Sequence, residues 1–78
     1  MKWAQRFPKP IVLKDGRRLV SLVQARDFMS ALPPSRVKNA HWVYAADRLF
    51  DAARTEDAEL IGDAHAQLLR ALAAEGLV

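Results

Sequence analysis

An Asp-Gly pair between two short apolar runs is the feature that most restricts how this chain folds. Asp15-Gly16 separates the apolar residues 11–13 from residues 19–20. Asp-Gly is favoured in two-residue β-hairpin turns, because a type I′ turn needs a positive φ at both central positions. Pro8 and Pro10 keep the chain before the first run extended. These residues predict an antiparallel β-hairpin near the start of the chain.

The register of this hairpin depends on its loop. With a two-residue loop, Ile11 pairs with Val20 and Leu13 with Arg18. One face then carries Ile11, Leu13 and Val20, and a one-residue bulge at Gly16 would change this register. The opposite face carries Val12 and Leu19, with Lys14 and Arg17 near the turn.

A first helix is expected directly after the hairpin. Ser21 and Gln24 form a capping box, in which the Ser21 hydroxyl accepts from the backbone of Gln24 and the Gln24 side chain returns to the Ser21 amide. Pro33-Pro34 ends this helix, and residues 35–39 then form a polar connector. The apolar residues at helical spacing are Leu22, Ala25, Phe28, Met29 and Leu32.

A second helix is expected from residue 40 to about residue 53, with Asn39 preferred over Ser35 as its N-cap. Its expected buried stripe is Val43, Ala46, Leu49, Phe50 and Ala53, widened by Trp42 and Tyr44.

A third helix is expected to begin after Thr55 as its N-cap and to end at Gly76. Gly62 lies inside this helix and is expected to mark a close backbone contact with another helix. Leu77 can fold back on the last turn. The expected buried stripe is Leu60, Ile61, Ala64, Leu68, Ala71 and Leu72.

The order β-β-α-α-α predicts an α+β fold in which a single layer of helices covers a two-stranded antiparallel hairpin. Residues 1–78 form one domain, and residues 1–8 are an extended or flexible lead-in. The chain has no cysteine, so packing, helix propensity or a second copy must stabilise it. A two-stranded hairpin has open edges, which favours pairing with another chain.

Charge is distributed unevenly along the chain. Residues 1–38 hold nine basic and two acidic side chains, a balance of +7, whereas residues 55–78 hold one and five, a balance of −4. Lys14, Arg17 and Arg18 flank the turn, and basic residues near aromatic ones can bind nucleic acid. The alternative is a solvated hairpin tip, with Trp3 and Phe7 folded onto the core.

Few residues suggest chemistry. The two histidines, His41 and His65, fall on different helices and are better interpreted as surface or packing residues than as metal ligands. The serines mostly have capping roles, and the isolated glycines form no phosphate loop. We expect no catalytic residue, no metal and no cofactor, and therefore not an enzyme. The chain also lacks a membrane-spanning run and an apolar signal segment, so a cytoplasmic location is expected.

Trp42 and Tyr44 cannot both lie centrally on one helical stripe, so either one of them lies at an interface or both rim the core. The leading hypothesis is a small non-enzymatic interaction module that associates with itself or with another protein. The alternative is a weak nucleic-acid-binding protein. The expected interaction surface comprises Trp42, Tyr44, Arg17, Arg18 and Lys14.

Several motifs also resemble a known family. They are Phe7-Pro8-Lys9-Pro10-Ile11, the Asp15-Gly16 turn, Gln24-Ala25, Leu32-Pro33, an alanine near Ala45, and Ala71-Leu72-Ala73-Ala74-Glu75-Gly76. The chain thereby resembles short bacterial proteins catalogued as domain of unknown function 982, which commonly place an aromatic residue where this chain has Leu32. The resemblance implies the same fold and a bacterial cytoplasmic origin, and it implies no activity.

Overall fold

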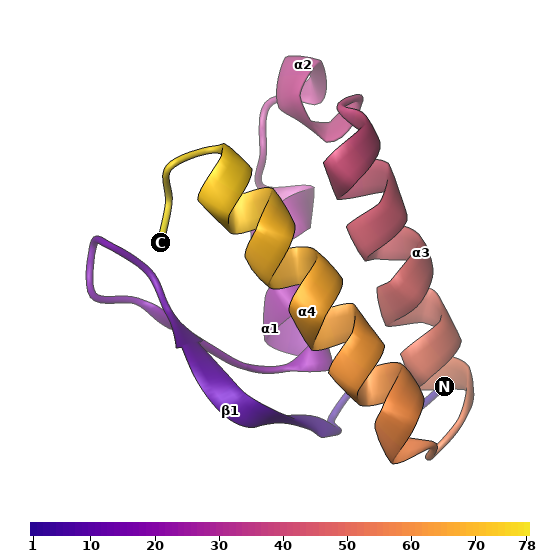
Figure 1. Cartoon of the computed structure of the whole chain (residues 1–78). Coiled ribbons are helices and arrows are strands. Elements are labelled where there is room, and N and C mark those ends of the chain that lie inside the picture. The colour runs from indigo at the N-terminus through magenta and orange to yellow at the C-terminus, as the bar shows by residue number, and fades with distance from the viewer.

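A two-stranded antiparallel hairpin is followed by helices that pack on one of its faces (Figure 1). The computed structural model describes residues 1–78 except for the side chain of Val37. The elements are β1 (Arg6–Val12), β2 (Arg18–Ser21), α1 (Leu22–Ser30), α2 (Pro34–Val37), α3 (Ala40–Arg54) and α4 (Ala58–Ala74). The predicted α+β class and the single hairpin are confirmed. None of the described helices is long and apolar enough to span a bilayer.

The turn differs from the predicted two-residue loop. Gly16 has a φ of +92°, and it is the only turn residue with a positive φ. The Gly16 N–H donates to the Leu13 carbonyl at 3.0 Å, and the Leu13 N–H donates to the Arg17 carbonyl at 2.8 Å. These bonds define a three-residue loop with a glycine bulge, which is the second common way to close a hairpin.

The bulge shifts the register by one residue. Ile11 pairs with Leu19 and Val12 pairs with Arg18, so the predicted Ile11–Val20 pair is wrong. Leu19 consequently joins Ile11 on the buried face, whereas Val12 is 53% exposed. Side chains alternate between the two faces of a strand, so one extra loop residue decides which apolar side chains enter the core.

Both edges of the hairpin have few free donors. Pro8 and Pro10 lie within β1 and have no N–H. The Val20 N–H of β2 donates to the Gln24 Oε1 at 2.7 Å. The Ser21 side chain accepts from the Gln24 N–H as predicted, but the Gln24 side chain reaches Val20 instead of Ser21. The arrangement disfavours strand addition at the hairpin, because an added strand needs unpaired backbone groups.

The predicted polar connector contains a short helix, α2, so the structure has four helices where three were expected. Pro34 occupies its first turn, where a missing N–H costs no hydrogen bond. Asn39 precedes α3 as predicted, but its side chain makes no capping bond.

The ends of α4 show one correction and one confirmation. Its N-cap is Asp57, whose side chain accepts from the Glu59 N–H at 2.8 Å, and Thr55 instead ends α3. At the other end, Gly76 has a φ of +72°, and the Leu77 N–H donates to the Leu72 carbonyl at 2.9 Å. These features form the predicted glycine C-cap with Leu77 folded back.

The core lies between the hairpin and the three longer helices, and α3 is rotated relative to the prediction. The buried side of α3, here called the core stripe, consists of Trp42, Ala45, Leu49, Ala52 and Ala53. Val43 and Phe50 were predicted to be buried, but they are 54% and 46% exposed. Alanines on the core stripe let α3 approach α4, whose buried residues include Ala64 and Ala71. Gly62 makes no close contact, since a Cβ built there meets nothing within 4 Å.

Candidate functional site

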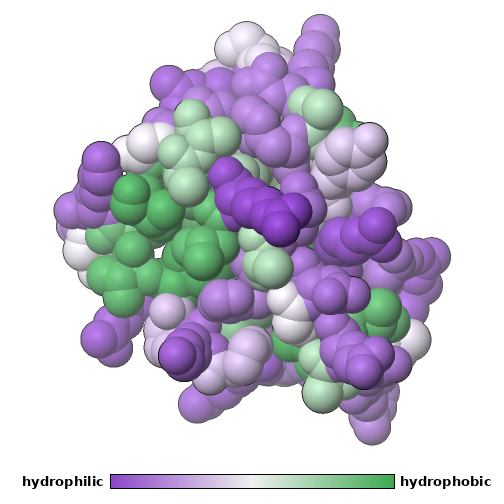
Figure 2. Space-filling model, viewed as in Figure 1, coloured by the Kyte–Doolittle hydropathy of each residue, from purple (hydrophilic) through white to green (hydrophobic). Residues whose placement is uncertain are grey.

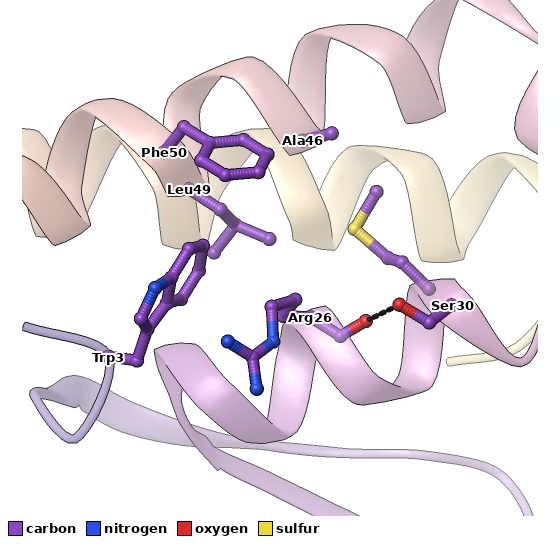
Figure 3. Close-up of a pocket in the computed structure, with 7 residues that line it drawn as sticks. Trp3, Arg26, Ser30, Ala46, Leu49 and Phe50 are labelled. Carbon is purple, nitrogen blue, oxygen red and sulfur yellow. Dashed lines mark hydrogen bonds between the residues drawn. The ribbon is translucent and has the colours of Figure 1, made fainter. Parts of the chain in front are cut away.

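A half-open apolar groove lies between α1 and α3 (Figure 3). Its volume is about 310 Å³, which is at the lower end of the range for binding pockets. We call it the α1–α3 groove. Its lining residues are Trp3, Arg26, Met29, Ser30, Ala46, Leu49 and Phe50.

The N-terminal segment supplies one wall of this groove. The Val23 N–H donates to the Trp3 carbonyl at 2.9 Å, and the Lys2 N–H donates to the Ala53 carbonyl. The Gln5 side chain donates to the carbonyl oxygens of α3's last turn and of Thr55. These bonds hold residues 2–5 against α1 and α3. The predicted lead-in of residues 1–8 is too long, because β1 begins at Arg6 and Phe7 is buried in the core.

Two aromatic contacts shape the mouth of the groove. The rings of Trp3 and Phe50 meet edge to face with centroids 5.2 Å apart. The Arg26 guanidinium lies 4.8 Å from the Trp3 ring centroid, a cation–π distance. Arg26 also pairs with the adjacent Asp27 at 3.3 Å. The groove therefore combines an apolar floor with one cation at its edge.

The polar groups of the groove are already engaged. The Ser30 hydroxyl donates to the Arg26 carbonyl at 2.9 Å, as the dashed line in Figure 3 shows. None of the residues that line the groove is a histidine or a carboxylate. Most of the lining side chains are apolar, so the groove suits contact with an apolar surface.

The exposed side of α3 continues the groove outwards. Val43, Ala46 and Phe50 follow one another at spacings of three and four residues and so lie along one helix face. We call these three residues the outer stripe. Large exposed apolar side chains in a row are typical of interaction surfaces.

Trp42 was predicted on an interaction surface, and this prediction is wrong. The Trp42 side chain is fully buried, and its indole N–H donates to the Glu75 Oε1 at 3.0 Å. Tyr44 is 59% exposed, but it follows Val43 directly and so points about 100° around α3 from that residue of the outer stripe. The structure thus separates the two aromatic residues that the sequence placed together.

Glu75 is the centre of a polar cluster that the sequence did not reveal. Its Oε1 accepts from Asn39, His41 and Trp42, and Arg36 lies 3.8 Å from its Oε2. The hydrogen bond from Trp42, then that from His41, lowers the pKa of Glu75. Because these donors precede or begin α3, Glu75 ties the end of α4 to the start of α3.

The predicted cations at the turn are all exposed. Lys14, Arg17 and Arg18 lie at the tip of the hairpin. Arg17 pairs with Asp15 at 2.7 Å, and its guanidinium lies 5.4 Å from the Phe28 ring centroid. The hydrogen bond from the Arg17 backbone N–H lowers the pKa of the Asp15 carboxyl.

The histidines occupy packing positions, as predicted. His41 contacts Glu75, and His65 packs edge to face on Phe7 with centroids 5.5 Å apart. Within the part of the chain that the structure describes, no three potential ligands gather into a metal-binding group.

A second apolar area lies where the C-terminal segment meets the hairpin and α4. It is the green area on the left in Figure 2. Leu77 and Val78 pack partly against the core, and Leu69 of α4 is 39% exposed.

No family model, no curated protein and no solved structure matches the chain. The resemblance to domain of unknown function 982 therefore stays a prediction.

Proposed function

We propose that this chain is a small non-enzymatic interaction module that associates reversibly with a second copy of itself. The observation that carries the proposal is the outer stripe beside the α1–α3 groove. Val43 and Phe50 are about half exposed, whereas Trp42 and Leu49 of the same helix are buried. Exposing such side chains on a monomer is unfavourable unless a partner covers them.

A second copy fits this surface because the outer stripe is self-complementary. A two-fold dimer uses the same patch on both subunits. The small residue Ala46 lies between the larger Val43 and Phe50. A two-fold axis near Ala46 lets two α3 helices approach closely and sets Val43 of one copy against Phe50 of the other.

The solvent-accessible surface area of the chain is that of a compact monomer, so any dimer is expected to be weak. This area is 4824 Å², close to the roughly 4,700 Å² expected for a folded monomer of this mass. The fold therefore does not need a partner to be compact. A standard interface covers about 800 Å² per partner, roughly a sixth of this surface. Because the outer stripe and the groove are smaller than that, we expect a micromolar or weaker dissociation constant.

Sedimentation velocity over about 10 µM to 1 mM tests the proposal, because this range brackets a weak dimer. The wild-type weight-average mass should rise with concentration. Phe50→Asp should keep the chain monomeric, since it places a carboxylate in the apolar interface. Circular dichroism confirms that each variant is folded.

Two matched variants locate the surface. Tyr44→Asp changes a more exposed aromatic residue of the same helix that lies outside the outer stripe, and it should dimerise normally. Leu69→Asp alters the apolar area of α4 and should also dimerise normally. A wild-type chain that stays monomeric throughout would overturn self-association, and loss of dimers only in Leu69→Asp would overturn the groove as its site.

We also propose that the module acts in a bacterial cytoplasm. The lack of cysteine agrees with a reducing compartment, and the bacterial origin rests on the family resemblance.

A further inference from the structure

The hairpin tip, α1 and α2 bring cations together around Phe28. Three shallow recesses of about 110, 410 and 180 Å³ all include Arg17 and Phe28 among their lining residues. Lys14 lines the first, Arg18 the second and Arg36 the third. We call these five residues the basic end. The grouping joins residues that lie up to 22 positions apart in the sequence.

A fixed guanidinium lies at the centre of the basic end. The Arg17 Nε donates to the Asp15 Oδ2 at 2.7 Å, and the Arg17 backbone N–H donates to the Asp15 Oδ1 at 2.9 Å. The guanidinium is thereby held above the Phe28 ring, at 5.4 Å from the centroid. Arginine planes and aromatic rings are both surfaces on which unpaired bases stack.

The hairpin, which carries Lys14, Arg17 and Arg18 of the basic end, has a positive charge balance. Residues 6–21 hold five basic side chains and one acidic side chain, a balance of +4, compared with +3 for the whole chain. Among the described side chains, Lys14 and Arg18 form no ion pair. Each nearby carboxylate is engaged by an arginine: Asp15 by Arg17, Asp27 by Arg26 and Glu75 by Arg36.

The acidic start of α4 is too far away to cancel this charge. The Lys14 N–H donates to the Leu77 carbonyl, which places the hairpin tip beside the C-terminal end of α4 (Figure 1). The acidic residues Glu56, Asp57 and Glu59 lie at the opposite end of this 17-residue helix. Such a helix is about 25 Å long, which is about three Debye lengths at physiological ionic strength.

We propose that the basic end binds single-stranded nucleic acid. Lys14, Arg18 and Arg36 would contact phosphates, and an unpaired base would stack at Arg17 and Phe28. A duplex keeps its bases stacked inside, so they could not enter a recess. An anionic membrane is a poorer fit, because Phe28 is half-buried in a recess and does not protrude to insert into lipid.

Fluorescence anisotropy with labelled 12-nucleotide dT and U oligonucleotides tests this proposal. Three phosphate contacts predict a slope of about −2 for log K against log salt, because each contact contributes about −0.7 on a single strand. The affinity should then fall about 15-fold between 50 and 200 mM salt. Lys14→Gln and Arg18→Gln should each make the slope shallower by about 0.7.

A charge-matched control separates the basic end from general basicity. Arg70→Gln removes the same charge from a polar recess that also contains Arg48 and Asp63, and it should bind like wild type. Phe28→Leu should bind at least about fivefold more weakly with an unchanged slope, because it removes stacking but no charge. Arg17→Lys, which keeps the charge but removes the planar guanidinium, provides a second stacking variant if Phe28→Leu unfolds.

The outcomes that overturn the proposal are distinct. They are no binding at 25 mM salt, equal losses in Arg70→Gln and Arg18→Gln, tighter binding to the matching duplex, or binding only to vesicles that contain phosphatidylserine. The basic end does not include the outer stripe, so Phe50→Asp should bind oligonucleotides normally. Failure of this proposal and failure of self-association are therefore distinguishable.

Discussion

The two apolar stripes of α3 have similar residues and different surroundings. On the core stripe, Trp42 is fully buried and Leu49 is 2% exposed, whereas Val43 and Phe50 of the outer stripe are about half exposed. α4 and α1 cover the first stripe, whereas Trp3 and α1 border the second at Ala46 and Phe50. Packing partners, and not hydrophobicity alone, therefore decide which side of a helix becomes core. The core stripe therefore stabilises the fold, and the outer stripe is the proposed surface for association.

The largest expected effect comes from the core stripe. Trp42→Ala should lower the free energy of unfolding by about 3–5 kcal/mol, because it leaves a cavity and removes the indole donor of Glu75. Phe50→Ala should cost about 1 kcal/mol, the size of an edge-to-face aromatic contact. Urea unfolding followed by circular dichroism measures both. If Trp42→Ala does not fold, Trp42→Phe gives the measurable case. Equal losses at Trp42 and Phe50 would contradict the division between the stripes.

A smaller, pH-dependent effect is expected at Glu75, which anchors the core stripe through Trp42. The pKa of Glu75 is lowered in the folded chain, so its ionised form stabilises the fold. This contribution is fully present above the ordinary glutamate pKa of about 4.3 and disappears as the pH falls through the lowered value. Glu75→Gln should therefore be less stable than wild type at neutral pH and equally stable in acid.

Urea titrations between pH 7 and pH 2 measure this difference. His41 and Arg36 also face the carboxylate, and both are retained in Glu75→Gln. Glu59→Gln is the control, because the Glu59 side chain forms no hydrogen bond or ion pair among the described residues. A stability gap at Glu75 that persists unchanged at pH 2 would show that shape, and not charge, is responsible.

Local signals in the sequence predicted much of the fold. The turn at Gly16, the Ser21 cap and the Gly76 cap depend on residues within a few positions, so their chemistry is visible without a structure. The hairpin register was wrong because a bulge adds one loop residue with no change in the sequence pattern. The cap at Thr55 was wrong because Asp57, two residues later, fulfils the same role.

The candidate site was less predictable because it depends on contacts between distant elements. The exposure of Lys14, Arg17 and Arg18 followed from the turn, but the approach of Arg17 to Arg36 needed the tertiary fold. The buried indole of Trp42 donates its hydrogen bond to Glu75, 33 residues away. The outer stripe had one signal in the sequence: α3 carries more apolar residues than one stripe can hold.

The smallest expected effect is that of Gly62→Ala, which should change the stability of the fold without changing dimerisation. Gly62→Ala should raise the free energy of unfolding by about 0.5–1 kcal/mol, because alanine favours the helix and its Cβ meets nothing within 4 Å. The change lies in α4, the helix that packs against the core stripe, and leaves the outer stripe untouched. Its dimer dissociation constant should therefore equal that of wild type when both are measured by sedimentation. If Gly62→Ala shifted the dimer equilibrium by the same free energy as the folding equilibrium, folding and association would be coupled, and the outer stripe would not be an independent surface.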